Sequence, residues 1–146
     1  MRTNHDQTTI KAKAEKAGRI VVIGSGFIGS ESASCLAMKY GKDASKQIHL
    51  VSNTEYPLEK VLGKEYGRML KKDHEANGVR FHSSAPLKEM NCDFNGNVTS
   101  VTLGNGEILA ADLVIFGTGV RPATCFLKDS GIQLNADGGV ICDPFL

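Results

Sequence analysis

The sequence predicts an α/β domain in which helices flank a parallel sheet and a short antiparallel meander forms a third layer. Two patterns support this fold class. Across residues 20–82, apolar runs alternate with longer helical segments, which is the order that builds a parallel sheet. After residue 86, short alternating segments are separated by Asn-Gly pairs, which favour β-hairpins. The apolar run at 112–116 is expected to return to the parallel sheet.

The individual elements are expected from apolar runs and from residues that begin or end helices. Asp6 is the expected N-cap of the first helix, and Gly18 is expected to follow its end. Gly41 ends the second helix, Pro57 breaks the next connection, and Asn77-Gly78 ends the third helix. Loops and a short helical turn are expected after residue 122. In chain order the elements are helix 7–17, strand 20–23, helix 27–40, strand 47–51, helix 62–76, strand 79–82, meander segments 87–93, 98–103 and 107–109, and strand 112–116.

Composition and cysteine spacing exclude several functional classes. The net charge of +1 gives no basic field for nucleic acid or an anionic membrane. The apolar content of 41% is ordinary for a soluble protein. No apolar run reaches the roughly 20 residues of a membrane-spanning helix, and the first residues lack a signal-peptide core. The cysteines form no C-x-x-C pair and are expected to be reduced core residues, in a reducing compartment such as the cytoplasm or a mitochondrion. They are Cys35, Cys92, Cys125 and Cys142.

A glycine-rich turn between the first strand and the second helix is the strongest functional signal. Residues 24–29 read Gly-Ser-Gly-Phe-Ile-Gly, in the strand–turn–helix context that a dinucleotide-binding G-x-G-x-x-G requires. Gly24 permits the sharp turn, Gly26 lets the backbone approach a pyrophosphate, and Gly29 lets the helix pack on the strand. The helix N-terminus offers free N–H groups to the phosphates. The pattern indicates dinucleotide binding by a Rossmann-like domain, and Ser25 is counted among the expected cofactor-binding residues; an unrelated glycine-rich turn is the alternative.

Three stretches together carry a family resemblance: residues 23–31, 60–66 and 117–122, with a similar lead-in at 2–6. This layout resembles the NAD-binding domain of the FAD-dependent pyridine-nucleotide oxidoreductase family, in particular its apoptosis-inducing-factor-like and ferredoxin-reductase-like members. Members of that family carry FAD-binding segments before and after this domain.

No FAD-binding segment is recognised in this sequence. The resemblance therefore implies one domain of a longer protein, with a free-standing short protein as the alternative. We expect a lead-in segment with a helix at 1–18, the NAD(H)-binding domain at 19–122, and a return segment toward an FAD domain at 123–146.

The resemblance also implies roles for residues beyond the glycines. Phe27 and Ile28 would line the path toward the nicotinamide, although both would equally pack on the sheet. Glu31 would bond the nicotinamide carboxamide or neighbour the flavin; its simpler role is to favour the helix dipole. Lys60 would contact NAD(H), or it is a solvated lysine at a helix start.

The two other strand ends supply the adenosine side of the expected site. A carboxylate that accepts from the ribose 2′-OH commonly follows the second strand, but Ser52 stands there, and Thr54 and Glu55 are alternatives. No arginine follows to clamp a 2′-phosphate, so we expect a shallow preference for NADH and leave NADPH open. The segment Gly117-Thr118-Gly119 would let the adenosine half approach closely; a plain turn is the alternative.

The sequence predicts neither catalytic residues nor a metal site in this chain, because its histidines lack metal-ligand spacing and no nucleophile set is evident. These histidines are His5, His49, His74 and His82. The expected function is to present NAD(H) to a flavin held by the FAD-binding domain of the parent chain. The alternative is a non-catalytic NAD(H)-binding sensor or scaffold of apoptosis-inducing-factor type.

Overall fold

The computed structural model describes residues 3–145, so the outermost positions of the predicted lead-in and return segments, residues 1–2 and 146, lie outside the described residues. The predicted fold class is confirmed, since a parallel sheet, flanking helices and an antiparallel sheet are all present. The elements are α1 (Asn4–Lys16), β1 (Arg19–Ile23), α2 (Phe27–Tyr40), β2 (Gln47–Val51), α3 (Glu59–Ala76), β3 (Val79–His82), β4 (Leu87–Cys92), β5 (Val98–Leu103), β6 (Ile108–Ala110), β7 (Leu113–Phe116) and a 3₁₀ turn η1 (Cys125–Leu127).

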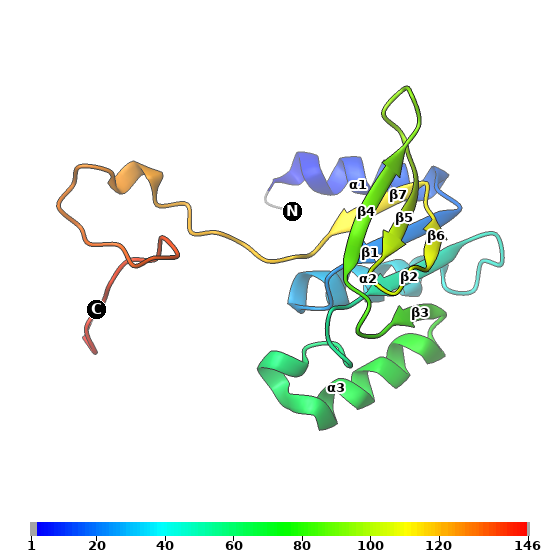
Figure 1. The fold of residues 1–146 in the computed structure, drawn as a ribbon, viewed down its shortest axis with the longest axis horizontal. Coiled ribbons are helices and arrows are strands. Elements are labelled where there is room, and N and C mark those ends of the chain that lie inside the picture. Colours follow the sequence, from blue (N-terminus) through cyan, green and yellow to red (C-terminus); the bar gives the residue numbers. More distant parts are fainter. Residues whose placement is uncertain (1–2, 146) are drawn as a thin grey trace.

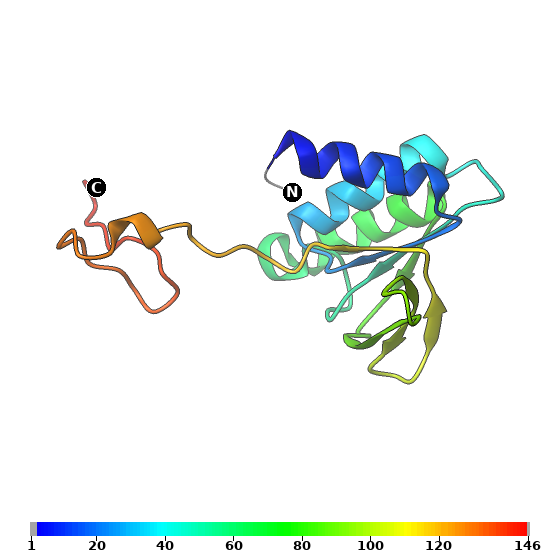
Figure 2. The same cartoon turned by 90° about the horizontal axis from the view of Figure 1, so that it is seen from above.

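The domain has three layers. The parallel sheet has the strand order β3-β2-β1-β7, and the antiparallel sheet has the order β4-β5-β6. Figure 2 shows α1, α2 and α3 together on one face of the parallel sheet and the antiparallel sheet on the other face. The meander therefore covers the face on which a doubly wound fold would place further helices (Figure 1).

The apolar strand β1 explains why both faces need a cover. Its side chains alternate, so that Ile20 and Val22 join the core beneath the helices, whereas Val21 and Ile23 join the core beneath the meander. All of them are fully or almost fully buried. The helix-side core includes Ala33, Leu36, Ile48, Leu50 and Ile115, and the meander-side core includes Val51, Val101, Leu103, Leu109 and Ala111.

The first helix begins three residues earlier than expected, and the prediction that Asp6 is its N-cap is wrong. Thr3 is the N-cap: its Oγ1 accepts from the backbone N–H of Asp6 at 3.1 Å. Asp6 occupies the third helical position and accepts from the Thr3 N–H at 2.9 Å. This reciprocal capping box satisfies two free N–H groups at once, which a cap at Asp6 alone cannot do.

The third helix also begins earlier than predicted, at Glu59 instead of residue 62. Gly63 interrupts it with φ 82° and ψ 168°, a conformation that glycine adopts at little cost. Leu58 precedes the helix in the left-handed region, with φ 54°. The extra turn before Gly63 carries Glu59 and Lys60 at the carboxyl edge of the sheet.

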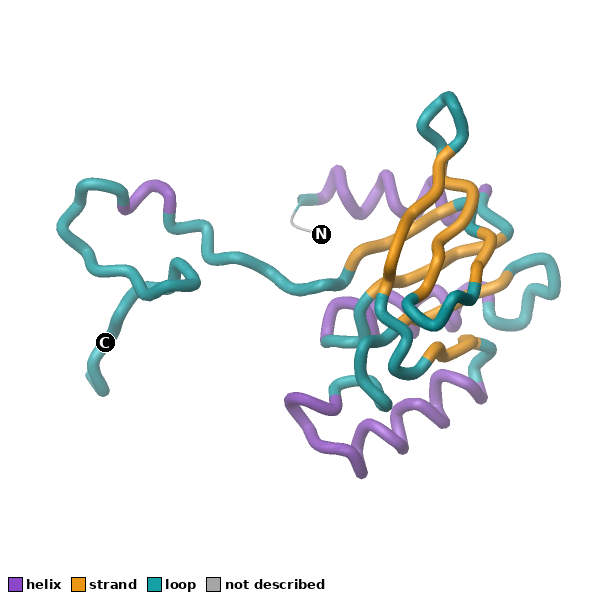
Figure 3. The backbone as a smooth tube through the Cα atoms, in the orientation of Figure 1, coloured by secondary structure: helices purple, strands orange, loops and turns teal. Residues whose placement is uncertain are grey.

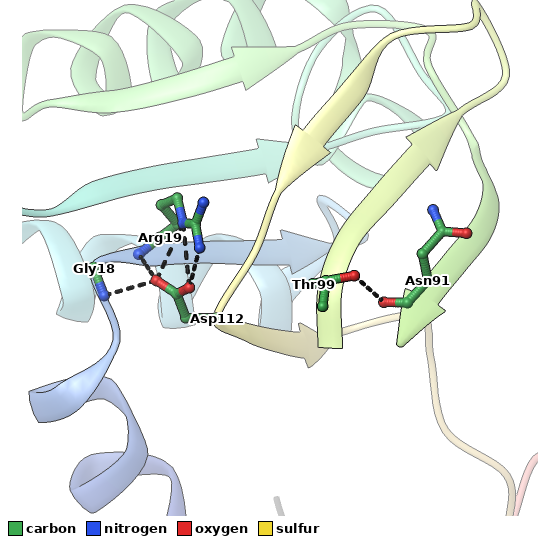
Figure 4. A network of polar contacts seen from close by, with 5 residues as sticks. All are labelled: Gly18, Arg19, Asn91, Thr99 and Asp112. Atoms are coloured by element: carbon green, nitrogen blue, oxygen red, sulfur yellow. Dashed lines mark hydrogen bonds and ion pairs between the residues drawn. The ribbon is translucent and has the colours of Figure 1, made fainter. Parts of the chain in front are cut away.

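The opposite edge of the sheet is held by Asp112, the residue directly before β7 (Figure 4). Its Oδ2 accepts from the backbone N–H groups of Gly18 at 3.0 Å and Arg19 at 2.8 Å. The Arg19 guanidinium also pairs with this carboxylate, and it is the main reason that the pKa of Asp112 lies below its usual range. Figure 4 also shows the Thr99 hydroxyl of β5 donating to the Asn91 carbonyl of β4 at 3.2 Å.

Beyond β7 the chain leaves the domain as an extended arm (Figures 1 and 3), with the expected loops and short helical turn. Its β-structure is an isolated bridge between Leu134 and Val140. Many apolar side chains of the arm are exposed: Val120, Phe126, Ile132, Leu134, Val140, Ile141 and Phe145. Between residues 3 and 145, none of the helices is long and apolar enough to cross a bilayer.

The prediction that the cysteines are core residues is wrong, because they are exposed free thiols. Cys35 lies on the outer side of α2, since its neighbours Ala33 and Leu36 take the inner side. Cys125 and Cys142 lie on the arm, which no second layer covers.

A histidine pair, buried at His49 and partly buried at His82, joins the parallel sheet to the meander. His49 of β2 is 6% exposed, and its Nδ1 lies 2.8 Å from Nε2 of His82 on β3. Nδ1 of His82 in turn lies 3.1 Å from Oε2 of Glu107. The pKa of His49 is lowered to about 4, mainly by burial; the nearby His82 and Arg80 contribute to the lowering, and Glu107 opposes it.

We predict that the free energy of unfolding falls as the pH is lowered from about 6.5 toward 4, because unfolded His49 binds a proton before folded His49 does. His49→Gln should make this fall shallower. Urea unfolding at pH 7.5 and pH 5 measures it, with His5→Gln, at an exposed position of α1, as the control. Equal pH dependence in wild type and His49→Gln would contradict the prediction.

Candidate functional site

A cleft of about 710 Å³ opens at the carboxyl edge of the parallel sheet. Open α/β sheets bind ligands at this edge. The cleft lies where β1, β2 and β7 end, beside the start of α2 and the loop that leads into α3. Its lining includes Gly24, Ser25, Gly26, Phe27, Ile28, Asn53, Thr54, Glu59, Lys60, Gly117, Thr118 and Gly119.

Mutual backbone contact holds the glycine-rich turn against β7. A Cβ added to Gly29 would lie 1.7 Å from the Gly24 carbonyl oxygen. A Cβ on Gly24 would lie 2.6 Å from the Gly117 oxygen, and one on Gly117 would lie 2.7 Å from the Gly29 nitrogen. Gly24 also has φ 97°, which disfavours other residues. These glycines are required by packing alone, whether or not a ligand binds.

Gly26 has no such internal reason to be glycine. Nothing lies within 4 Å of an added Cβ at this position. Its backbone is extended, with φ −72° and ψ −170°, which any residue adopts. The missing side chain at Gly26 therefore leaves open space in the cleft, so that a ligand there could come into contact with the protein backbone.

The open space at Gly26 lies before an uncapped helix. Gly26 is the N-cap of α2, and no side chain caps the helix there. The N–H groups of Phe27 and Ile28, in the first turn, have no intrahelical acceptor. Free N–H groups and the positive end of the helix dipole together favour an anion such as a phosphate.

Ser52 lies under the cleft rather than in its wall. It is 2% exposed, and its Oγ lies 2.6 Å from Oγ of Ser25 and 2.9 Å from Oγ1 of Thr54. The Thr54 N–H also donates to Ser52 Oγ at 3.0 Å. Of the hydroxyl groups near the end of β2, those of Ser25 and Thr54 belong to residues that line the cleft.

The carboxylate at the cleft is Glu59, which sequence reasoning missed. Glu55 lies outside the lining and pairs with Lys64 at 3.0 Å. Glu59 lines the cleft, where its Oε2 accepts from the Tyr56 N–H at 3.1 Å and its Oε1 lies 3.7 Å from Lys64. The early start of α3 places Glu59 here, so a correct helix boundary would have revealed it.

Lys60 lines the cleft as an exposed side chain. Asn53, exposed and also missed from the sequence, lines the cleft beside Thr54. The cleft thus presents an amide and a hydroxyl group from the loop that follows β2 and an ammonium group from the first turn of α3.

Glu31 is not brought into the cleft. It lines a neighbouring groove between α1 and α2, of about 700 Å³, together with Gln7, Lys11 and Cys35. Ile28 lines both the cleft and this groove, so it stands at their junction. A ligand that extends past Ile28 would therefore reach the side of α2 on which Glu31 lies.

No metal centre is evident in the part of the chain that the structure describes. Among residues 3–145, no group of three or more histidine, cysteine, aspartate or glutamate side chains is placed to hold a metal ion.

Comparison with known proteins identifies the family. The family model for the pyridine nucleotide-disulphide oxidoreductases matches residues 1–146. This chain belongs to that family. It is 33% identical to apoptosis-inducing factor 3 of Mus musculus over 138 residues, covering 94% of this chain and 22% of that protein. It is 30% identical to a ferredoxin–NAD(P)⁺ reductase of Sphingomonas sp. over 143 residues, covering 98% of this chain and 33% of that protein.

A solved structure has the same fold. The chain superimposes on the ferredoxin reductase for the CYP199A2 system from Rhodopseudomonas palustris with a TM-score of 0.84 and 27% identity, covering 97% of this chain and 33% of that one. The chain thus spans between about a fifth and a third of the length of these relatives.

We predict that Gly29→Ala destabilises the domain by more than the 1–3 kcal/mol or so that overpacking commonly costs, because its Cβ has no room beside Gly24. Gly26→Ala, in the same loop, should change the melting temperature little. Thermal unfolding followed by circular dichroism compares the two variants. Equal stability of both would contradict the packing role of Gly29.

Proposed function

We propose that this chain is the NAD(H)-binding domain of an FAD-dependent NAD(P)H oxidoreductase. The observation that carries the proposal is the combination at Gly26: open space that packing does not require, in front of the uncapped N-terminus of α2. That combination suits a pyrophosphate, which needs close backbone approach and N–H donors.

The residues of the cleft fit the parts of NAD(H). The N–H groups of Phe27 and Ile28 would hold the pyrophosphate, and Lys60 would add a positive charge. The adenosine half would lie against the end of β7, at Gly117, Thr118 and Gly119. The ribose would meet the loop after β2, which presents an amide and a hydroxyl.

The task of this chain would be to position the nicotinamide. When bound, the nicotinamide and the flavin exchange a hydride, which is chemistry that the cofactors supply. The side chains of Phe27 and Ile28 would direct the nicotinamide end out of the cleft toward Glu31. The chain itself would contribute binding and orientation and no catalytic residue.

The FAD would be held by an FAD-binding domain elsewhere in the parent protein. Two features support this. The chain spans about a third of the Sphingomonas reductase, which leaves length for such a domain. The arm after β7 also exposes apolar side chains, including Phe126, Ile141 and Phe145, that a partner domain would cover. The exposed free thiols support a reducing intracellular compartment, the cytoplasm or a mitochondrion.

A second candidate is a non-catalytic NAD(H)-binding sensor or scaffold. It is favoured by the likeness to apoptosis-inducing factor 3. The two candidates share the cleft and differ in hydride transfer, so NADH oxidation by the full-length protein with its flavin distinguishes them.

We predict that the 146-residue chain binds NADH, is colourless and does not oxidise NADH, because the flavin would belong to another domain. Isothermal titration calorimetry measures binding, with NADH on the order of 1 mM, near a typical upper KM. Absorbance at about 340 nm measures the oxidation of NADH. Oxidation of NADH by the pure colourless chain would overturn the proposed division of labour.

We also predict that Gly26→Val abolishes NADH binding while the fold is retained, because the branched side chain would fill the open space. Gly26→Ala should weaken binding to an intermediate degree. Gly18→Ala is the matched control: it adds a Cβ in ordinary contact, at the opposite edge of the sheet. Unchanged NADH affinity in a folded Gly26→Val variant would show that the cofactor does not use this turn.

A further inference from the structure

We propose that the Ser25 hydroxyl oxygen accepts a hydrogen bond from an adenosine ribose hydroxyl of NADH, and that Ser52 and Thr54 hold it in this acceptor role. The inference rests on the proposed function and deepens it. It assigns selectivity between NADH and NADPH to the direction of a short chain of hydroxyl groups under the cleft.

The Thr54 end of this chain of hydroxyl groups sets the direction of its hydrogen bonds. Thr54 Oγ1 lies 2.7 Å from the carbonyl oxygen of Tyr56, which can only accept, so Thr54 donates its single proton there. The contact of 2.9 Å between Ser52 Oγ and Thr54 Oγ1 must then run the other way. Ser52 donates and Thr54 accepts.

The hydrogen bond between Ser25 and Ser52 has a fixed direction for the same reason. Because the proton of Ser52 is used on Thr54, the 2.6 Å contact between Ser25 and Ser52 requires Ser25 to donate. Ser52 Oγ also accepts from the Thr54 N–H at 3.0 Å. It thus donates one bond and accepts two, which is the full capacity of a hydroxyl. Ser52 has no bond left to offer a ligand.

Ser25 is the open end of the chain. Its proton is used, but no group among residues 3–145 donates to its Oγ, which keeps free lone pairs. Ser25 lines the cleft although it is only 8% exposed, so those lone pairs lie at the ligand site with little water. A buried acceptor without a donor is costly, and a ligand O–H would satisfy it.

A fixed acceptor discriminates between the two cofactors. The ribose 2′-OH of NADH can donate to Ser25, and the chain of hydrogen bonds would strengthen that bond cooperatively. The 2′-phosphate of NADPH presents acceptor oxygens and negative charge, which the lone pairs of Ser25 repel. This arrangement supplies a preference for NADH although no carboxylate stands at the end of β2.

The test reverses the direction of the hydrogen bonds between these hydroxyl groups. Thr54→Val removes the acceptor for the Ser52 proton, so Ser52 can donate to Ser25, and Ser25 can then donate into the cleft. We expect the NADPH-to-NADH affinity ratio to rise roughly two- to tenfold, the value of one hydrogen bond. Ser25→Ala should weaken NADH binding by a similar factor and leave NADPH unchanged. Calorimetric titration with both nucleotides measures the ratios, and circular dichroism confirms folding.

Thr99→Val is the control, since this hydroxyl lies in the meander and bonds to Asn91. The inference is overturned if the wild type binds NADH and loses it on Gly26→Val, yet Ser25→Ala and Thr54→Val keep the wild-type affinity ratio. If the wild type binds neither nucleotide, the proposed function itself fails. The two failures are therefore distinct.

Discussion

The close approach of backbone at Gly24, Gly29 and Gly117 is the constraint on which the rest of the site depends. With no side chains between them, the turn after β1, the first turn of α2 and the end of β7 lie in direct contact. This contact holds the uncapped start of α2 at the carboxyl edge of the sheet. The Gly24 N–H, which donates to the Val51 carbonyl at 2.9 Å, links the same turn to β2. The cleft is the space that these contacts leave open.

The glycines of the motif thus divide by physical role. Gly24 and Gly29 serve the fold, because added Cβ atoms would collide with backbone. Gly26 leaves open space that the fold does not need, and the proposed function assigns this space to the cofactor. The end of β2 shows a similar division: Ser52 is saturated beneath the cleft, whereas Ser25 retains acceptor capacity within it.

The sequence predicted the strands and α2 closely because their signals are local. Apolar runs such as 20–23 need only burial on two faces, and the Asn-Gly pairs determine their own hairpins. The sequence-based prediction failed where two residues act together, or where the backbone angles of one residue decide where a helix begins. The cap at Thr3 depends on reciprocal bonds with Asp6, and the start of α3 depends on the backbone angles of Gly63. The site residues beyond the glycine motif depend on side-chain direction, which spacing alone does not supply.

The central claim is that the cleft at Gly26 binds NADH, and a titration of the ¹⁵N-labelled chain with NADH, followed by amide chemical shifts, tests it most directly. We predict that the largest shifts occur at residues 24–29, 53–60 and 117–119, the segments that contain most of the cleft lining. Shifts confined to the groove between α1 and α2, or to the arm after β7, would contradict it.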